Sequence, residues 1–515
     1  MNDKIEKTLS IDDQLEKYLI KNNILNEIEL QAAKMERSIT EDHLGAILVR
    51  NGFLHQDILV KALIKITNKN LVHEEIILPH VPPELLYELR CKIAAQTVED
   101  VYVATLGNED ETVYKLQKYF PSQNVVLIDA DSDSIEAYLE KLKTIHDSEA
   151  SLLETIIRDA IMNDVSDIHI IPRAKSYTVL NRRLGVRELE LEGDKEDYLT
   201  LSARIKDRSR MDLAERRKPQ DGGFNIDYNG RIVDLRVATV PTVEGEAIVI
   251  RILDPAKANK KLKELGISNI QAWNKASTRL NGLCLITGAT GSGKTTTLNA
   301  TVRELDRFGR SIYTAEDPVE YNIPYIVQVN INDAVGLDFS RALKSFMRAD
   351  PDVIILGEIR DEDTARNAIK AAETGHLVFA TLHTNSIISS VNRMRDLGVP
   401  AHELKYVLRA ILTQTLVRVS CTHCDGTDKK CQHCRGSGYS GRQIVSECHY
   451  FNTMEETELV LEKKEIRWKT IVEDAYDLYM SGATTREEFV RVFGAEAQDM
   501  IEERESQSKN EESVD

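Results

Sequence analysis

The chain has 515 residues, 42% of them hydrophobic, which is enough material for about three or four domains with cores of their own. Its formal net charge is −18, and this acidic balance argues against a sequence-independent DNA-binding protein, which normally presents a basic face. No apolar run reaches the roughly 18 residues of a membrane-spanning helix, and the charged start is unlike a signal peptide. We therefore expect a cytosolic protein whose seven cysteines form no disulfides.

The first half of the chain divides into three regions and a linker. Apolar residues recur at helical spacing through residues 1–72, which predicts a helical N-terminal docking region. Residues 73–147 mix helical and strand-like segments and predict a small α/β domain. A helix followed by several short strands predicts an α+β domain over residues 148–256. The lysine-rich segment 257–263 is then expected to be a linker.

The second half has the pattern of a nucleotide-binding domain. Residues 264–418 alternate strands with helices, which predicts an α/β fold with a mainly parallel sheet. A four-cysteine segment follows at 419–445, and C-terminal helices are expected at 446–495. Residues 496–515 are charged and rich in serine, so they predict a disordered acidic tail.

A phosphate-binding loop is the most specific motif in the chain. Residues 288–295 match the pattern G-x-x-x-x-G-K-[ST] between an apolar, strand-like run and a helix-prone segment. The glycines allow backbone N–H groups to close around phosphate oxygens, Lys294 can reach the β- and γ-phosphates, and Thr295 can ligate Mg²⁺. The alternative is a glycine-rich turn that matches by accident. We predict a nucleotide site formed by Gly288, Ala289, Thr290, Gly291, Ser292, Gly293, Lys294, Thr295 and Thr296.

Polar residues follow the other predicted strands of this domain. The apolar run 353–356 leads to Glu358, a second run ends at Glu316, and a third is preceded by His376 and followed by His383. Because strand ends face the ligand crevice in such sheets, Glu358 is expected to act on Mg²⁺ or its water, and His383 to contact the γ-phosphate. The alternative for each residue is an ordinary polar cap on a buried strand.

The four clustered cysteines predict a zinc site. Cys421 and Cys424 form one C-x-x-C pair, and Cys431 and Cys434 form another six residues later. Four thiolates can surround Zn²⁺ tetrahedrally and close a structural site that contributes local folding energy. The alternatives are four reduced cysteines without metal, or a redox pair, for which a single C-x-x-C would suffice.

Taken together, these motifs resemble the secretion ATPases of type II secretion and type IV pilus assembly. The resemblance covers residues 75–450, because earlier motifs such as SDIHI, AERRKPQDGGF and DLRVATVPTVEGEAIVIRIL also occur in family order. It implies a RecA-like P-loop NTPase domain preceded by a PAS-like α+β domain and a small helical and α+β N-terminal region, with a zinc-binding insertion. It also implies a homo-hexameric motor that binds ATP, Mg²⁺ and Zn²⁺ and drives pilin or pseudopilin polymerisation. Such motors work at the cytoplasmic face of the inner membrane, held there by a platform protein and a cytoplasmic adaptor, without nucleic acid.

The resemblance also implies roles for individual residues. Glu316 would orient or deprotonate the attacking water, Glu358 would act on Mg²⁺, and His376 and His383 would belong to a histidine box. Arg236 and Arg251 would approach the nucleotide, often across a subunit boundary. The alternative for these arginines is a salt bridge, with Asp234 or Glu246 as possible partners.

Three other functions share parts of this sequence pattern. A RecA-like DNA translocase or helicase would share the nucleotide domain, but the acidic balance speaks against it. A retraction ATPase typically lacks the cysteine pairs, and a non-hydrolysing scaffold would not need Glu316 and Glu358. The basic segment 204–218 is expected to be a solvated helix face. Residues 43–54 faintly resemble a cyclic dinucleotide motif, but packing or docking is favoured because only one imperfect copy is present.

Overall fold

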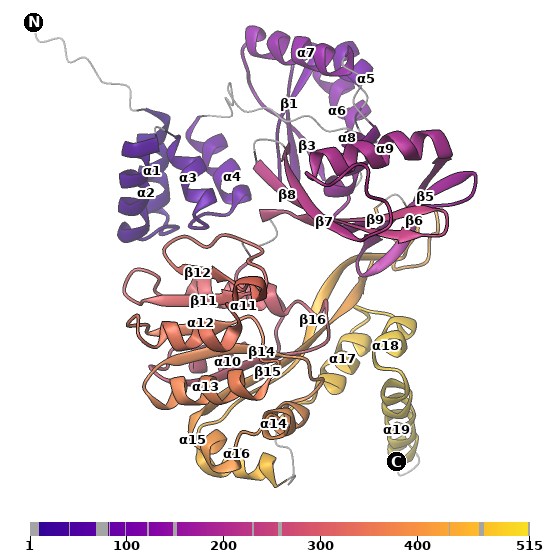
Figure 1. Ribbon diagram of the computed structural model, residues 1–515. Coiled ribbons are helices and arrows are strands. Elements are labelled where there is room, and N and C mark those ends of the chain that lie inside the picture. The colour runs from indigo at the N-terminus through magenta and orange to yellow at the C-terminus, as the bar shows by residue number, and fades with distance from the viewer. Residues whose placement is uncertain are drawn as a thin grey trace, which may run out of the picture. The chain divides into compact units, whose positions relative to one another are not determined.

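The chain folds into two compact units, Met1–Lys257 and Ala258–Asp515 (Figure 1). The computed structural model describes residues 10–40, 42–67, 81, 83–97, 99–120, 123–147, 152–228, 231–255, 260–431, 433–462 and 468–512. None of the described helices has the length and apolar character needed to cross a lipid bilayer.

The first unit begins with a four-helix cluster. Leu15, Leu19, Leu44, Ile47 and Leu48 are almost completely buried in one apolar core. The first helix starts at Ser10, whose hydroxyl accepts a hydrogen bond from the Asp13 N–H in a capping box. The helices are α1 (Ile11–Lys21), α2 (Glu27–Thr40), α3 (Leu44–Arg50) and α4 (Gln56–Ile66).

A three-stranded sheet with its own helices follows in the same unit. The middle strand pairs antiparallel with the strand before it and parallel with the strand after it. Val60 of α4 packs in one cluster with Ala94, Tyr102 and Ile135, so the helical cluster shares a core with this sheet. Its elements are α5 (Pro83–Glu88), β1 (Cys91–Gln96), β2 (Asp100–Thr105), α6 (Glu109–Gln117), β3 (Asn124–Leu127) and α7 (Ser132–Asp147).

The third part of this unit is a six-stranded antiparallel sheet in the order β6-β5-β4-β9-β8-β7. The apolar faces of α8 and α9 pack into one core with strands β4, β8 and β9, and Figure 1 shows both helices beside this sheet. Its elements are α8 (Leu152–Met162), β4 (Val165–Pro172), β5 (Ser176–Arg183), β6 (Val186–Asp194), α9 (Lys195–Arg208), β7 (Gln220–Tyr228), β8 (Arg231–Thr242) and β9 (Gly245–Leu253).

The second unit is built on a seven-stranded sheet in the order β12-β11-β13-β14-β10-β15-β16. All neighbouring strands are parallel except the last pair, as the sequence predicts for a mainly parallel sheet. Helices α12 to α15 cover one face and α10 and α11 the other, so β10 and β14 are buried along their whole length. The strands are β10 (Gly282–Thr287), β11 (Ile312–Glu316), β12 (Val327–Asn330), β13 (Val353–Leu356), β14 (Leu377–Leu382), β15 (Leu408–Ser420) and β16 (Tyr439–Tyr450). The helices are α10 (Ile270–Ser277), α11 (Lys294–Glu304), α12 (Phe339–Phe346), α13 (Glu362–Glu373), α14 (Ile387–Asp396), α15 (Ala401–Val407), α16 (Met454–Leu461), α17 (Ile471–Met480), α18 (Arg486–Phe493) and α19 (Ala495–Glu512), with 3₁₀ turns η2 (Leu262–Glu264) and η3 (Asp333–Val335).

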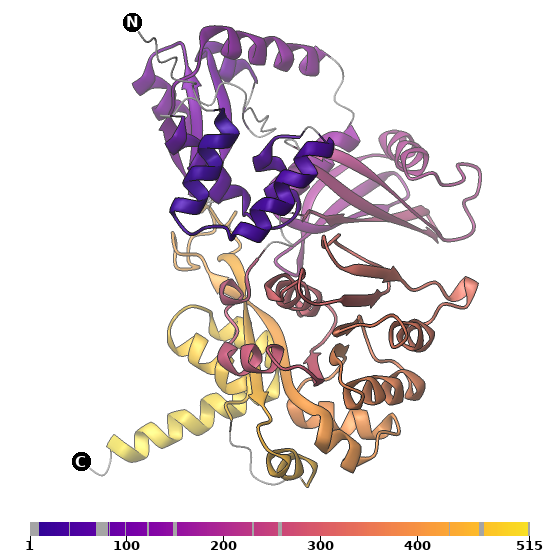
Figure 2. The ribbon, with the colours of Figure 1, turned by 90° about the vertical axis from the view of Figure 1, so that its left-hand side faces the viewer.

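The C-terminal part of this unit differs from the expectation in two places. The sheet continues past residue 418 into β15 and β16, so the cysteines occupy the connection between two long paired strands. Figure 2 shows the C-terminal helices, in yellow, alongside these strands. A helix, α19, stands where the sequence predicts a disordered tail, because Ala497 and Ile501 pack against Phe489 and its glutamates favour helix.

A buried ion pair joins the C-terminal helices to the sheet. Glu488 of α18 is completely buried and accepts hydrogen bonds from Arg418 of β15, through its backbone N–H at 3.0 Å and its Nη2 at 2.6 Å. Arg491 donates to both carboxylate oxygens at 2.6 Å. Burial raises the pKa of Glu488, but these hydrogen bonds outweigh it and leave the pKa below its ordinary value. The charged carboxylate is therefore stabilised in the folded chain.

We expect Glu488→Gln to lower the free energy of unfolding by about 2–4 kcal/mol, because it leaves two arginines without their buried counter-charge. The exposed neighbour Glu487 provides a matched control, since Glu487→Gln is expected to cost less than about 1 kcal/mol. Thermal unfolding of the full chain measures both. Because the folded pKa is lowered, the contribution of Glu488 is present above the unfolded value of about 4.3 and is lost as pH falls through the folded value. Equal midpoints for the two variants at neutral pH would contradict this account.

Candidate nucleotide-binding site

The phosphate loop lies at the carboxyl end of β10, which is flanked by β14 and β15. Helix α11 begins directly after it at Lys294, with Gly293 as its N-cap at φ +89°. A Cβ atom on Gly288, at φ +149°, would lie 2.3 Å from the carbonyl oxygen of Gln414. Only glycine fits there, so the loop wraps tightly against β15 and directs its N–H groups into the space before α11.

The polar groups of this loop fit an anion. The Lys294 Nζ donates to the carbonyl oxygens of Gly288 at 2.8 Å and Ala289 at 3.0 Å, so the ammonium lies in the mouth of the loop. Burial lowers the pKa of Lys294, and the charge of Glu358 opposes that shift. The Ser292 hydroxyl is buried and has no hydrogen-bond partner among the described residues. A bound phosphate group would accept a hydrogen bond from the Ser292 hydroxyl and offset the charge of the buried Lys294 ammonium.

Glu358 and His383 meet at the ends of two neighbouring strands. Glu358 follows β13 and His383 follows β14, and the Glu358 Oε2 lies 3.5 Å from the His383 Nε2. Arg360 forms an ion pair with the other Glu358 oxygen and also contacts Asp317 at 3.1 Å. Arg360 is not among the predicted site residues, although it stands two residues after Glu358 in the same motif. The structure therefore adds a guanidinium to the predicted group.

Glu316 lies further from the phosphate loop in the sheet order. It ends β11, which is separated from β10 by β13 and β14. Its carboxylate is buried, with 8% exposure, and its Oε1 accepts hydrogen bonds from Thr314 at 2.6 Å and Gln328 at 3.0 Å. The side chain is thus held by β11 and β12, and the second carboxylate oxygen is left to act elsewhere.

His376 does not lie with His383. It precedes β14, and its carbonyl accepts from the Gly282 N–H at the start of β10, at the opposite end of both strands from the phosphate loop. Six strand residues separate the two edges by about 20 Å. The structure therefore does not bring His376 to the nucleotide site of its own unit. Its ring Nδ1 instead lies 2.9 Å from the carbonyl oxygen of Ala371.

Arg236 and Arg251 belong to the first unit, where they stand directly opposite each other on β8 and β9. Arg251 donates to Asp167 of β4 at 3.0 Å, and its side chain is 60% exposed. Arg251 thus forms a salt bridge, as the alternative interpretation expects, but with neither of the possible partners named for it. Glu246 pairs with Lys206, and Asp234 stands opposite Leu253. The cross-strand partner Asp167 comes from sheet register, which the sequence pattern did not reveal.

The four cysteines converge as the spacing predicts. Their four sulfur atoms all lie within 4.8 Å of one another, with Cys421 and Cys431 at 4.0 Å and Cys424 and Cys434 at 3.7 Å. Zinc–sulfur bonds of about 2.3 Å in a tetrahedron place sulfurs about 3.8 Å apart, so the cluster fits a zinc ion. The His433 Nδ1 lies 3.3 Å from the Cys421 sulfur. That histidine stacks on His423 at 4.2 Å.

Comparisons with known proteins identify the family to which the chain is similar. Residues 144–491 match the family described as type II/IV secretion system protein, which is more than half of the chain. The type II secretion system protein E of Aeromonas hydrophila is 35% identical over 453 residues, covering 81% of this chain and 85% of that protein. The type IV pilus assembly ATPase PilB of Myxococcus xanthus is 31% identical and covers 93% of this chain and 98% of that protein.

A solved structure supports the fold. The ATPase DotB of Legionella pneumophila aligns with a TM-score of 0.53 at 20% identity, covering 67% of this chain and 95% of that one. At this identity the likeness shows the fold alone. The predicted resemblance, the P-loop α/β fold and the assignment as an ATP hydrolase are confirmed, whereas the PAS-like character of residues 148–256 stays a prediction. With a family match over residues 144–491 and relatives above 30% identity, the chain belongs to the type II/IV secretion system protein family and is an ATPase.

Proposed function

We propose that this chain is the hexameric ATP-hydrolysing motor of a type II secretion or type IV pilus assembly machine. The observation that carries the proposal is the phosphate loop beside the Glu358–His383 pair, in a chain similar over most of its length to ATPases of both machines. The motor works at the cytoplasmic face of the inner membrane and drives polymerisation of pilin or pseudopilin subunits. A platform protein and a cytoplasmic adaptor hold it there, and nucleic acid takes no part. These matches favour a secretion motor over a DNA translocase.

The chemistry follows from the arrangement of the side chains. Lys294 exchanges the carbonyl oxygens of Gly288 and Ala289 for the β- and γ-phosphates. Thr295 and Glu358 would hold Mg²⁺, which neutralises phosphate charge when bound. His383 and Arg360 hold the Glu358 carboxylate in place. His383 would contact the γ-phosphate. Glu316 orients or deprotonates the attacking water. Arg236 and Arg251 add positive charge beside the phosphates of a nucleotide bound at a subunit boundary. His376 has no role at this site.

We expect Glu358→Gln to reduce the turnover of ATP by at least about a hundredfold while leaving nucleotide affinity nearly unchanged, because the amide keeps the shape and loses the charge. Steady-state phosphate release and binding of a fluorescent ATP analogue measure the two effects. Glu373→Gln, an exposed position at the end of α13, is the control and should hydrolyse ATP as the parent does. Full turnover in the Glu358 variant would remove its catalytic role.

Glu316→Gln tests the second carboxylate. The amide can still bond to Thr314 and Gln328, so the fold around β11 should persist while turnover falls by at least about tenfold. Separate measurements of turnover and nucleotide affinity decide the role. A weaker affinity with unchanged turnover would make Glu316 a binding residue instead.

We also propose that the four cysteines hold a structural zinc ion. The cluster lies between β15 and β16, and the Cys421 N–H donates to the carbonyl oxygen of Gly438 at 2.8 Å, so the connection is closed at its base. Each ligand comes from a turn next to these strands. A closed four-thiolate shell leaves no open position for chemistry, so the ion would stabilise the connection without entering the ATPase reaction.

Replacing Cys421 and Cys424 with serine should remove about one zinc ion per chain, because two thiolates do not close the site. Metal analysis of the purified chain measures the loss, and proteolysis near residues 421–438 should accelerate. Serine at Cys448, a buried cysteine of β16 outside the cluster, is the control and should retain the metal. A parent protein without zinc would end this proposal.

A further inference from the structure

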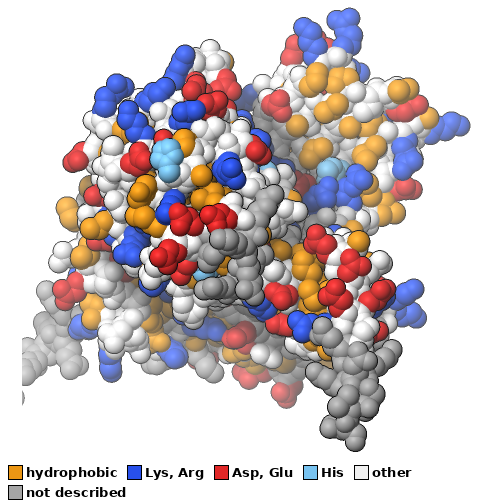
Figure 3. Space-filling model, turned by 90° about the horizontal axis from the view of Figure 1, so that it is seen from below, with side chains coloured by type: hydrophobic (Ala, Val, Ile, Leu, Met, Phe, Trp, Pro, Cys, Tyr) orange, Lys and Arg blue, Asp and Glu red, His pale blue; other side chains and the backbone are white. Residues whose placement is uncertain are grey.

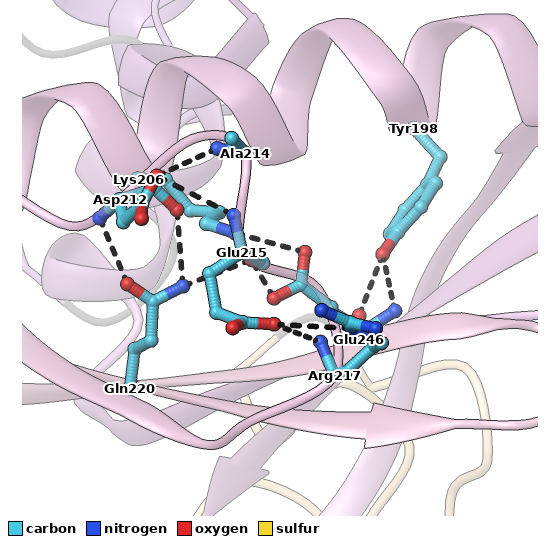
Figure 4. Close-up of polar contacts among 8 residues, drawn as sticks. All are labelled: Tyr198, Lys206, Asp212, Ala214, Glu215, Arg217, Gln220 and Glu246. Atoms are coloured by element: carbon cyan, nitrogen blue, oxygen red, sulfur yellow. Dashed lines mark hydrogen bonds and ion pairs between the residues drawn. The ribbon is translucent and has the colours of Figure 1, made fainter.

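A buried ion pair lies beneath the loop that follows α9 in the first unit. The Nζ atom of Lys206 lies 3.1 Å from both carboxylate oxygens of Glu246, and the two side chains are only 2% and 6% exposed. Figure 4 shows this pair together with the loop residues around it. Desolvating two charges costs free energy that their attraction only partly returns, so stability alone is a poor reason for such a pair.

The pair fixes the loop to the sheet. Lys206 also donates to the carbonyl oxygen of Glu215, in the loop, at 2.6 Å. The Tyr198 hydroxyl donates to the Glu246 carbonyl at 2.6 Å and accepts from the Glu246 N–H at 3.0 Å. Because Lys206 and Tyr198 lie on α9 and Glu246 on β9, the loop is connected to both elements at one point (Figure 4).

Further contacts determine the path of the loop backbone. The Gln220 side chain accepts from the Asp212 N–H at 2.8 Å and donates to the carbonyl oxygens of Asp212 and Glu215 at 3.1 Å. The Asp212 carboxylate accepts from the Ala214 N–H at 2.8 Å. A Cβ on Gly222 would lie 2.3 Å from the carbonyl oxygen before the loop, at Ser209, so the strand approaches closely here. These contacts restrict the backbone of the loop before any partner binds.

The outer side of the same loop carries three consecutive cations. Arg216, Arg217 and Lys218 are all exposed, and the Arg217 side chain is 93% exposed although its Nε forms a long ion pair with Glu215 at 4.0 Å. Among the described residues, neither Arg216 nor Lys218 has an ion-pair partner. Leu213, at 49% exposure, adds an apolar side chain nearby. A restricted backbone that carries three exposed cations is suited to recognise an anionic surface at low entropic cost.

We propose that this loop, Arg216–Lys218, docks on an acidic surface of a second copy of the chain. The chain has 84 acidic against 66 basic Lys and Arg residues, so a second copy offers the complementary charge. Asp and Glu side chains gather in several groups on the face shown in Figure 3. The proposal rests on the hexameric motor proposed above and names the surface that brings subunits together. The sequence predicts a solvated helix face over 204–218, but α9 ends at Arg208 and residues 216–218 lie in the loop after it. This loop alone is the proposed contact surface, and Lys206 and Glu246 act as its positioning residues.

The test reverses the charge of two loop residues. We expect Arg216→Glu with Lys218→Glu to raise the dissociation constant of self-association at least about tenfold, measured by sedimentation velocity with Mg²⁺ and a non-hydrolysable ATP analogue. The control, Arg187→Glu with Arg204→Glu, makes the same change in net charge at exposed positions outside the loop and should associate as the parent does. The difference between the two variants should shrink at high salt.

A second variant tests the positioning role. Lys206→Met with Glu246→Leu replaces the buried pair by apolar side chains, which cores commonly tolerate. We expect the fold to persist, the amides of residues 212–217 to exchange hydrogen faster, and self-association to weaken although Arg216 and Lys218 remain. Faster exchange with unchanged association would overturn the positioning role.

The outcomes separate this proposal from the proposed function. If the parent associates and the loop variant associates equally well, the loop proposal is wrong while the motor assignment stands. A parent that stays monomeric under all of these conditions also refutes it. If the loop variant instead loses binding to vesicles of anionic phospholipid and keeps self-association, the partner is a membrane and the proposal is wrong. Full ATP turnover in the Glu358 variant would count against the motor's site without bearing on the loop.

Discussion

The parallel alignment of β10, β13 and β14 is the constraint on which the nucleotide site depends. These strands are buried on both faces, so their apolar side chains fix their order and register within the sheet. Their carboxyl ends then place the phosphate loop, Glu358 and His383 along one edge. Residues more than sixty positions apart in the sequence, such as Lys294 and Glu358, therefore lie at this edge, although no single motif contains both.

The parts of the site that the sequence predicts are those encoded locally. The phosphate loop is contiguous, and the place of Glu358 and His383 at the sheet edge follows from two apolar runs that each lead to a polar residue. Their contact with each other is visible only in the structure. His376 shows where this reasoning stops. It was assigned through the resemblance, whereas the direction of β14 places it at the far edge of the sheet. Because His376 precedes the run 377–382 and His383 follows it, the two histidines must lie at opposite edges of the sheet.

Other features depend on pairing between distant strands, and periodicity carries no information about that. The contact between Arg251 and Asp167 exists because β4 and β9 are neighbours in one particular register. The helix α19 forms because its first turns find an apolar surface made by α17 and α18, although its composition suggests disorder. Arg360 was overlooked because its role arises from proximity to two carboxylates on different strands.

The strand β15 connects the phosphate loop with the cysteine cluster inside a single rigid element. The Gln414 Nε2 donates to the carbonyl oxygen of Ser292 in the loop at 2.8 Å, and the same strand runs on to Cys421. Seven residues of extended chain span about 23 Å. A tilt of about 5° at Gln414 would thus displace the cluster by about 2 Å. The paired strands β15 and β16 thus have the geometry of a lever arm, in which a small tilt beside the phosphate loop would give a larger displacement at the cysteine cluster.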